Sequence, residues 1–174
     1  MRKTNDVDLI IPHLWLGNYD TSQNEQFMRQ NKINVVVNCT KNVPFIDLTS
    51  NSDIKNELCR YKYRVAVEDD LTTKEIKKMK EYLDTIIDYV RHHMLKERNV
   101  FIHCMAGMQR SAIICYCYLC KYEYPDNHRT AFNIMRRERP IVFTPGMNFE
   151  NAYLEYFKDS LQPKPKQKRR QKQV

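Results

Sequence analysis

The 174-residue sequence lacks any apolar run long enough to cross a membrane. Its beginning, Met1 to Asp6, is polar and charged and does not have the pattern of a secretion signal. Internal repeats are absent as well. These absences, together with six cysteines, are typical of a protein that keeps its thiols free in a reducing compartment. We therefore expect an intracellular protein without a membrane span, located in the cytoplasm and, if its basic end acts as an import signal, also in the nucleus.

A complete metal-binding pattern is also missing. Cys117 and Cys120 have the spacing of half a zinc site, but no second cysteine pair or histidine pair accompanies them at ligand spacing. Both fall in the same apolar stretch as Cys115, where cysteine usually fills a core. We expect no metal ion and no cofactor.

Acidic residues are missing from the end of the chain. Positions 163–172 contain six Lys or Arg residues, and subtracting these from the formal net charge of +8 leaves +2 for the remainder. The charge block, the prolines and the lack of large apolar side chains predict a disordered basic tail over 162–174. Such a tail either keeps the protein soluble or contacts a nucleic acid or an acidic partner. The remainder is not basic enough to predict a nucleic-acid-binding surface.

The rest of the sequence is sufficient for one domain, which we assign to 1–161. A chain of this length can bury one sizeable core but not two ordinary ones. The run 33–39 is almost continuously apolar, which is typical of a strand buried on both faces. Strands are predicted at 10–17, 33–39, 61–67 and 98–104, and helices at 22–30, 72–94, 112–121, 126–137 and 147–158. This alternation indicates an α/β fold with a central, mostly parallel sheet flanked by helices.

Polar residues mark the starts of three of these helices. Ser22 and the pair Asp126-Asn127 are predicted caps, and Thr72 with Glu75 has the spacing of a capping box. The polar segment 41–57, which contains Pro44, is predicted to be a connection.

The most informative stretch is His103-Cys104-Met105-Ala106-Gly107-Met108-Gln109-Arg110-Ser111. It joins a predicted strand to an apolar helix, and at such a turn backbone N–H groups and the helix dipole favour an anion. The same position lowers the pKa of a cysteine, and the thiolate is the nucleophilic form. An arginine six positions after the cysteine can face back into the loop and hold two phosphate oxygens. The glycine between them lets the backbone approach the anion.

A less specific interpretation is that Cys104 is a small buried residue before an apolar helix. That interpretation leaves the arginine, the serine and their spacing unexplained. The combination at a strand-to-helix turn favours a loop that cleaves phosphate esters.

These residues resemble the signature loop of the cysteine-dependent protein tyrosine phosphatases. The Ala106-Gly107 pair and Ser111 are most similar to the dual-specificity branch. Weaker similarities extend from about Val7 to Leu161, at 14–18, at 33–40 and at 139–149. The resemblance implies a protein tyrosine phosphatase-like fold and a dual-specificity phosphatase catalytic domain over 1–161.

The resemblance also implies a role for each position of the loop. Cys104 attacks phosphorus and forms a phosphocysteine, Arg110 holds the equatorial oxygens, and Ser111 helps the sulfur to leave. His103 is expected to orient the loop and to help lower the pKa of the thiol. The implied substrate-binding residues are Met105, Ala106, Gly107, Met108, Gln109 and Arg110.

A carboxylic acid must protonate the leaving oxygen. Glu68-Asp69-Asp70 directly follows the predicted strand 61–67, and the family has its acid on a loop after such a strand. We predict that Asp69 is the acid, with Asp70 as the alternative, because spacing alone does not resolve adjacent side chains on a loop. By itself, the acidic cluster is typical of a solvated turn before a helix.

Two positions depart from the family pattern. Gln109 occupies a position where many members have a small Ser or Asn, which changes the rim of the loop. Pro145-Gly146-Met147-Asn148-Phe149 resembles the family's PN-x-GF segment with the Asn and Gly positions interchanged. Whether Asn148 supports the catalytic loop is therefore an open question for the structure.

The implied substrates are proteins phosphorylated on tyrosine, serine or threonine. The sequence has no Asn-Arg-Tyr-type segment of the kind that deepens the pocket of tyrosine-specific members. Phosphoinositide phosphatases of the superfamily carry lysines in the loop, and here Met105, Met108 and Gln109 are uncharged. Two alternatives stay open: an RNA 5′-phosphatase of the same superfamily, in view of the basic tail, and a non-catalytic module that binds phosphoproteins. Nothing in the sequence specifies an oligomeric state.

Overall fold

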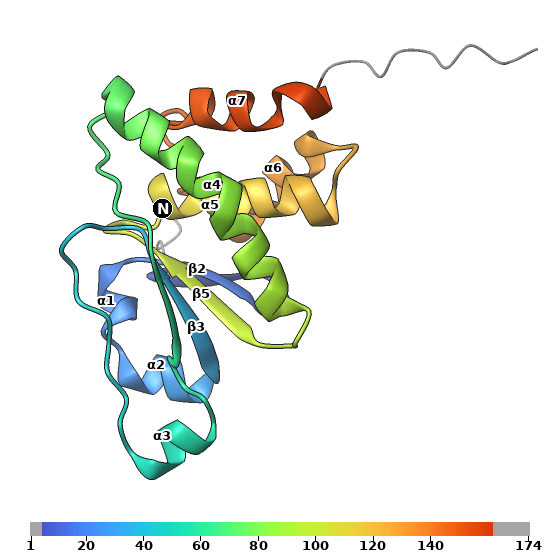
Figure 1. The fold of residues 1–174 in the computed structure, drawn as a ribbon. Helices are drawn as coiled ribbons and strands as arrows, with labels where there is room; N and C mark the ends of the chain where they lie inside the picture. Colours follow the sequence, from blue (N-terminus) through green and yellow to red (C-terminus); the bar gives the residue numbers. More distant parts are fainter. Residues whose placement is uncertain (1–4, 162–174) are drawn as a thin grey trace, which may run out of the picture.

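The computed structural model describes residues 5–161, which form a central sheet with helices on both faces (Figure 1). Its strands are β1 (Val7–Ile11), β2 (Leu14–Gly17), β3 (Ile33–Asn38), β4 (Tyr61–Arg64) and β5 (Asn99–His103). They lie in the order β1-β2-β5-β3-β4. β1 pairs with β2 in antiparallel orientation, and the other neighbours are parallel. The predicted α/β fold with a mostly parallel central sheet is confirmed.

The helices divide between the two faces of the sheet. In Figure 1, α4, α5, α6 and α7 lie on one side, and α2 and α3 lie on the other. A π-helical turn, η1 (Leu119–Glu123), continues α5. The bounds are α1 (Tyr19–Ser22), α2 (Glu25–Gln30), α3 (Asn51–Lys55), α4 (Thr73–Met94), α5 (Arg110–Tyr118), α6 (His128–Glu138) and α7 (Glu150–Leu161).

The central strands are buried on both faces, as predicted for 33–39. Successive side chains of a strand point to opposite faces. In β5, Val100 and Ile102 belong to the large apolar cluster that includes α4 and α5, whereas Phe101 packs with Phe27 and Met28 of α2. The sheet is therefore held from both sides, and the loops that leave its ends start from fixed positions.

The predicted strand 10–17 is wrong in one respect, because it is two strands. Pro12 has no backbone N–H to donate to a neighbouring strand, and His13 has a φ of 68°. The chain therefore turns at these two residues, and β1 folds back on β2.

Two helix predictions need similar corrections. The helix predicted at 22–30 begins only at Glu25, since Ser22 is the last residue of α1, and Asn24 rather than Ser22 caps α2 by accepting a hydrogen bond from the N–H of Phe27. Within the predicted connection 41–57, Ser50 caps the five-residue helix α3 through the N–H of Asp53. In both cases a polar side chain begins a helix that is too short to show an apolar period.

The predicted capping box at the start of α4 is half right. Thr72 accepts a hydrogen bond from the N–H of Glu75, as expected. The carboxylate of Glu75 does not return to Thr72; it accepts from the backbone N–H of Glu68 at 2.9 Å and from Lys78 at 2.7 Å. These bonds lower the pKa of Glu75 to about 2. Glu75 thereby ties the start of α4 to the acidic stretch 68–70.

The phosphate-loop candidate lies between the carboxyl end of β5 and the start of α5. In open α/β sheets this edge is where ligands bind. Within 5–161, no helix is both long and apolar enough for a membrane crossing. The predicted basic tail, 162–174, lies outside the described residues.

Candidate active site

The sulfur of Cys104 sits at the centre of the loop and is almost completely buried. The hydroxyl of Ser111 and the backbone N–H of Gly107 both donate hydrogen bonds to it, each at 3.2 Å. α5 begins at Arg110, and the side chain of Gln109 does not cap it. The first N–H groups of α5 therefore face the loop, that of Ser111 toward the Cys104 sulfur, as helix starts do at anion sites.

These surroundings give Cys104 an unusual acidity. Burial by itself raises the pKa of the thiol, but the hydrogen bonds from Ser111 and Gly107 and the positive charge of Arg110 outweigh it, and the pKa of Cys104 is lowered. In the other cysteines burial is the dominant effect. Burial raises the pKa of Cys39, Cys59, Cys115, Cys117 and Cys120 above the ordinary thiol value.

The guanidinium of Arg110 faces the same loop. One nitrogen donates to the carbonyl of Val67 at 3.2 Å, and the Nε atom is buried without a hydrogen-bond partner. The carboxylates of Glu68 and Asp69 lie 3.7 and 3.9 Å from guanidinium nitrogens, at ion-pair distance. A buried guanidinium with an unused donor is suited to a phosphate oxygen.

Arg139 is a residue of this site to which the sequence reasoning assigned no role. Its guanidinium is buried and donates to the carbonyl oxygens of Gly107 at 2.8 Å and Ala106 at 3.2 Å. It also pairs with Asp8 of β1 at 2.6 Å. By holding these carbonyls, Arg139 leaves the N–H groups of the loop for an anion. The signal in the sequence was an arginine placed before Pro140, which by itself does not indicate a partner.

Gly107 is required for this arrangement. Its φ is 65°, and a Cβ atom at this position would lie 2.5 Å from the carbonyl oxygen of Gly17. Both the backbone conformation and the close approach of β2 exclude a side chain. The sequence suggested that Gly107 lets the backbone approach an anion. The structure gives a more specific reason, the contact with Gly17 of β2.

The two candidate acids lie in different places. Asp69 faces the loop, where its Oδ1 atom accepts a hydrogen bond from Asn148 at 2.8 Å. Asp70 faces away, and its Oδ1 atom accepts from the backbone N–H and the hydroxyl of Thr72, both at 3.0 Å. Asp70 thus forms the turn before α4, whereas Asp69 shares a pocket with Cys104.

The pocket has a volume of about 320 Å³. The loop forms its base and the segment after Phe143 forms one wall. Met105 is half exposed at its rim. The residues that line the pocket are Asp69, Cys104, Met105, Ala106, Met108, Gln109, Arg110, Thr144, Pro145 and Asn148. Gly107 is not part of the lining, but its N–H contacts the sulfur.

His103 lies on the other side of the sheet from Cys104. Its ring stacks on Phe101 at 5.5 Å, and burial lowers its pKa to about 4. Both ring nitrogens are buried without a hydrogen-bond partner. A neutral imidazole on the opposite face supplies no charge to the thiolate, so the expectation that His103 helps to lower the pKa of Cys104 finds no support.

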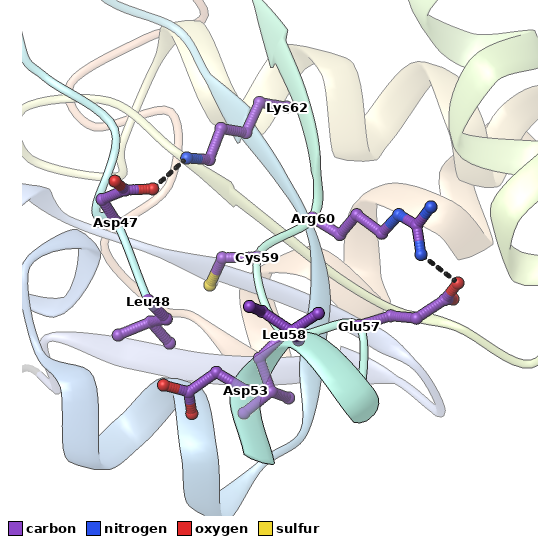
Figure 2. A pocket seen from close by; sticks show the side chains of 9 residues that line it. Asp47, Leu48, Asp53, Glu57, Leu58, Cys59, Arg60 and Lys62 are labelled. Carbon is purple, nitrogen blue, oxygen red and sulfur yellow. Dashed lines mark hydrogen bonds and ion pairs between the residues drawn. The ribbon is translucent and has the colours of Figure 1, made fainter. Parts of the chain in front are cut away.

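A second pocket, of about 370 Å³, lies near the amino ends of β3 and β4 (Figure 2). It also contains a cysteine, carboxylates and an arginine. Figure 2 shows that these charges are paired with each other, Arg60 with Glu57 and Lys62 with Asp47. No three His, Cys, Asp or Glu side chains in the described part of the chain are grouped to hold a metal ion.

The sequence matches the family model for the dual specificity phosphatase catalytic domain over residues 14–159. It is 30% identical to human dual specificity protein phosphatase 8 over 148 residues, which are 84% of this chain and 21% of that protein. It is 25% identical to mouse dual specificity protein phosphatase 14 over 151 residues, which are 84% of this chain and 67% of that protein. The chain spans about a fifth of the length of the first curated relatives it matches.

Solved structures show the same fold. Human DUSP28 superposes with a TM-score of 0.73 at 18% identity, covering 90% of this chain and 96% of that one. The Orf virus tyrosine phosphatase OH1 superposes with a TM-score of 0.66 at 16% identity, covering 88% and 87%. Since the family model covers most of the sequence, the chain belongs to the dual-specificity phosphatase family of the protein tyrosine phosphatase superfamily.

Proposed function

We propose that this chain hydrolyses phosphate monoesters on tyrosine, serine and threonine side chains of proteins, through a phosphocysteine intermediate. The observation that carries the proposal is the environment of one sulfur. Cys104 receives two hydrogen bonds, has a lowered pKa, and shares its pocket with Arg110 and Asp69. These are the groups that a thiolate-based phosphoryl transfer needs.

In the first step the Cys104 thiolate attacks phosphorus. A P–S bond forms while the ester P–O bond breaks, and the leaving oxygen takes a proton from the carboxylic acid of Asp69. Arg110 and the N–H groups of the loop hold the equatorial oxygens as charge moves onto them. Met105, Ala106, Gly107, Met108 and Gln109 contribute through this backbone.

In the second step the Asp69 carboxylate takes a proton from water, and the water oxygen attacks phosphorus. The P–S bond breaks, and the thiolate leaves with its charge stabilised by the Ser111 hydroxyl and the Gly107 N–H. Inorganic phosphate is released, and both the thiolate and the protonated Asp69 are restored. The cycle needs no metal ion or other cofactor.

Two observations support dual specificity. The relatives are named dual specificity protein phosphatases, and the sequence has no Asn-Arg-Tyr-type segment of the kind that deepens the pocket of tyrosine-specific members. A shallow pocket admits the short side chains of phosphoserine and phosphothreonine as well as the longer phosphotyrosine. The half-exposed Met105 at the rim leaves the loop open on that side.

The proposal is tested with three phosphopeptides of one sequence, carrying phosphotyrosine, phosphothreonine or phosphoserine, and with a 5′-triphosphate RNA. We expect phosphate release from the peptides, inhibited by orthovanadate, and a phosphocysteine at Cys104 after rapid acid quenching. Release from the RNA alone would identify the chain as an RNA 5′-phosphatase.

The fold is also similar to human tyrosine phosphatase-like serine/threonine/tyrosine-interacting protein, with a TM-score of 0.69 at 18% identity, covering 90% of this chain and 98% of that one. Binding of a phosphopeptide without turnover, by an intact and reduced protein, would favour a non-catalytic binding module here.

A further inference from the structure

The side chain of Gln109 connects the phosphate loop to the segment that forms the pocket wall. It is only 6% exposed. Its Nε2 atom donates to the carbonyl oxygens of Gly146 at 2.8 Å and Thr144 at 3.3 Å, and its Oε1 atom accepts from the backbone N–H of Asn148 at 3.1 Å. One carboxamide thus uses both its donor and its acceptor groups on three backbone positions of this wall.

The wall segment in turn holds the acid. Asn148 donates through Nδ2 to Oδ1 of Asp69 at 2.8 Å, while Oδ2 of Asp69 lies 3.9 Å from Arg110. Since Oδ1 accepts this hydrogen bond, Oδ2 is the oxygen left available to carry the proton that a general acid donates. A chain of contacts therefore runs from the phosphate loop through Gln109 and Asn148 to Asp69.

The ends of the wall segment have other supports. Arg136 donates to the hydroxyl of Thr144 at 2.9 Å, and Phe149 is fully buried in the core. Between these anchors, residues 145–148 are bonded to the loop through Gln109. A serine or an asparagine at position 109 is too short to reach all three backbone groups from the same place. Gln109, Gly146 and Asn148 are the positions that depart from the family pattern. Direct hydrogen bonds thus connect Gln109 to the other two.

We propose that Gln109 is a positioning residue for the general acid, acting through Asn148 to keep Oδ2 of Asp69 directed at the leaving oxygen. This inference rests on the proposed function. The role is separate from any contact of Gln109 with the phosphate, which its backbone N–H can make in either case.

The test compares leaving groups, because a general acid matters most when the departing oxygen is a strong base. Phenyl phosphate needs the proton, whereas 2,4-dinitrophenyl phosphate does not. Gln109→Met keeps the length of the side chain and removes its hydrogen bonds. We expect kcat/KM, which reports formation of the phosphocysteine, to fall about 10- to 100-fold for phenyl phosphate, the usual cost of a small misplacement, and to change little for dinitrophenyl phosphate. Gln26→Met, on the exposed face of α2, is the matched control.

A second pair of variants separates positioning from general support of the fold. Asn148→Ala, at a half-buried position, must show the same dependence on leaving group. In an Asp69→Asn background, Gln109→Met must have no further effect on phenyl phosphate, since the group it positions is gone.

If Gln109→Met lowered kcat/KM equally for the two aryl phosphates, the role of Gln109 would be overturned while the proposed function stayed intact. The same holds if its loss of kcat/KM added to that of Asp69→Asn. Failure of the unmodified protein to hydrolyse either compound would overturn the proposed function itself, and the Gln109 inference with it.

Discussion

Two pockets of this molecule, one around Cys104 and one around Cys59, contain similar kinds of residue and differ in chemistry. Each has a cysteine, an arginine and at least one carboxylate, and their volumes are similar, about 320 Å³ around Cys104 and about 370 Å³ around Cys59. They lie at opposite ends of the parallel strands. Cys104 follows the carboxyl end of β5, whereas Cys59 precedes the amino end of β4 and donates its N–H to Ile33.

The surroundings of the two sulfurs explain the difference. The sulfur of Cys104 receives hydrogen bonds from Ser111 and Gly107, and its pKa is lowered. Cys59 packs with Leu48 and Leu58, and burial raises its pKa to about 12. At neutral pH the thiol of Cys59 is protonated and is not a nucleophile.

The charged groups of the two pockets differ in whether they are paired with other groups of the protein. In the pocket of Figure 2, Arg60 pairs with Glu57, and Asp53 is held by Arg29 and Ser50, which lower its pKa to about 2. In the pocket around Cys104, Arg110 keeps a buried Nε atom without a hydrogen-bond partner. A pocket of suitable size and composition is therefore not a site unless its donors are left for a ligand.

Substitution of the two cysteines is expected to give the largest difference in kcat between the two pockets. Cys104→Ser should lower kcat for an aryl phosphate by on the order of 10⁴-fold or more, because the nucleophile is removed. Cys59→Ser should leave kcat within about twofold, since that thiol takes no part in the reaction. Steady-state phosphate release measures both. Full activity of Cys104→Ser would refute the mechanism.

The arginines give the next largest contrast. Arg110→Lys should lower kcat by about 10²- to 10³-fold, since an ammonium group replaces a planar pair of donors that stabilises the transition state. Arg60→Lys keeps its charge next to Glu57 and should change kcat by no more than about twofold. Binding of vanadate provides a second measurement, and tight binding by Arg110→Lys would contradict the assigned role.

A smaller contrast is expected between the adjacent aspartates. Asp69→Asn should lower kcat for phenyl phosphate by about 10²-fold and flatten the alkaline limb of its pH profile, because the proton donor is lost. Asp70→Asn retains the Oδ1 acceptor for Thr72 and should change kcat by no more than about twofold. The reverse result would assign the acid to Asp70.

The smallest effect concerns the acidity of Cys104. Ser111→Ala removes a donor to the sulfur and should lower turnover about tenfold, the usual loss for one hydrogen bond to a charged atom. It should also raise the pKa of Cys104, so that alkylation by iodoacetamide reaches its half-maximal rate at a higher pH. Mass spectrometry of each site follows this change. Cys59 should stay unmodified in the folded protein, and equal labelling of both cysteines would contradict the comparison.

Much of the fold was predictable because the signals are local. The continuous apolar run at 33–39 and the helical period of the apolar residues after Thr72 are both patterns of neighbouring residues, and both elements are present. The errors have local causes as well. The helix α3 is too short to show a period, and the turn at Pro12 and His13 divides a stretch whose apolar residues suggest one strand.

That Cys104, Arg110 and Ser111 lie together was likewise predictable, since they fall within eight consecutive residues. Asp69 and Asp70 were not distinguishable, because their spacing from the strand is nearly the same. The contacts that separate them come from Asn148 and Thr72, and the first of these lies 79 positions along the chain.

The sequence by itself predicted the chemistry of the loop and determined the alternation of strands and helices, because both follow from residues that are close along the chain. Only the tertiary structure decided which aspartate shares the pocket of the sulfur, that Arg139 holds the loop carbonyls, and that Gln109 contacts the pocket wall. Those contacts join residues 32 to 79 positions apart. They depend on how the sheet brings distant loops to one edge, and no short pattern of residues records that arrangement.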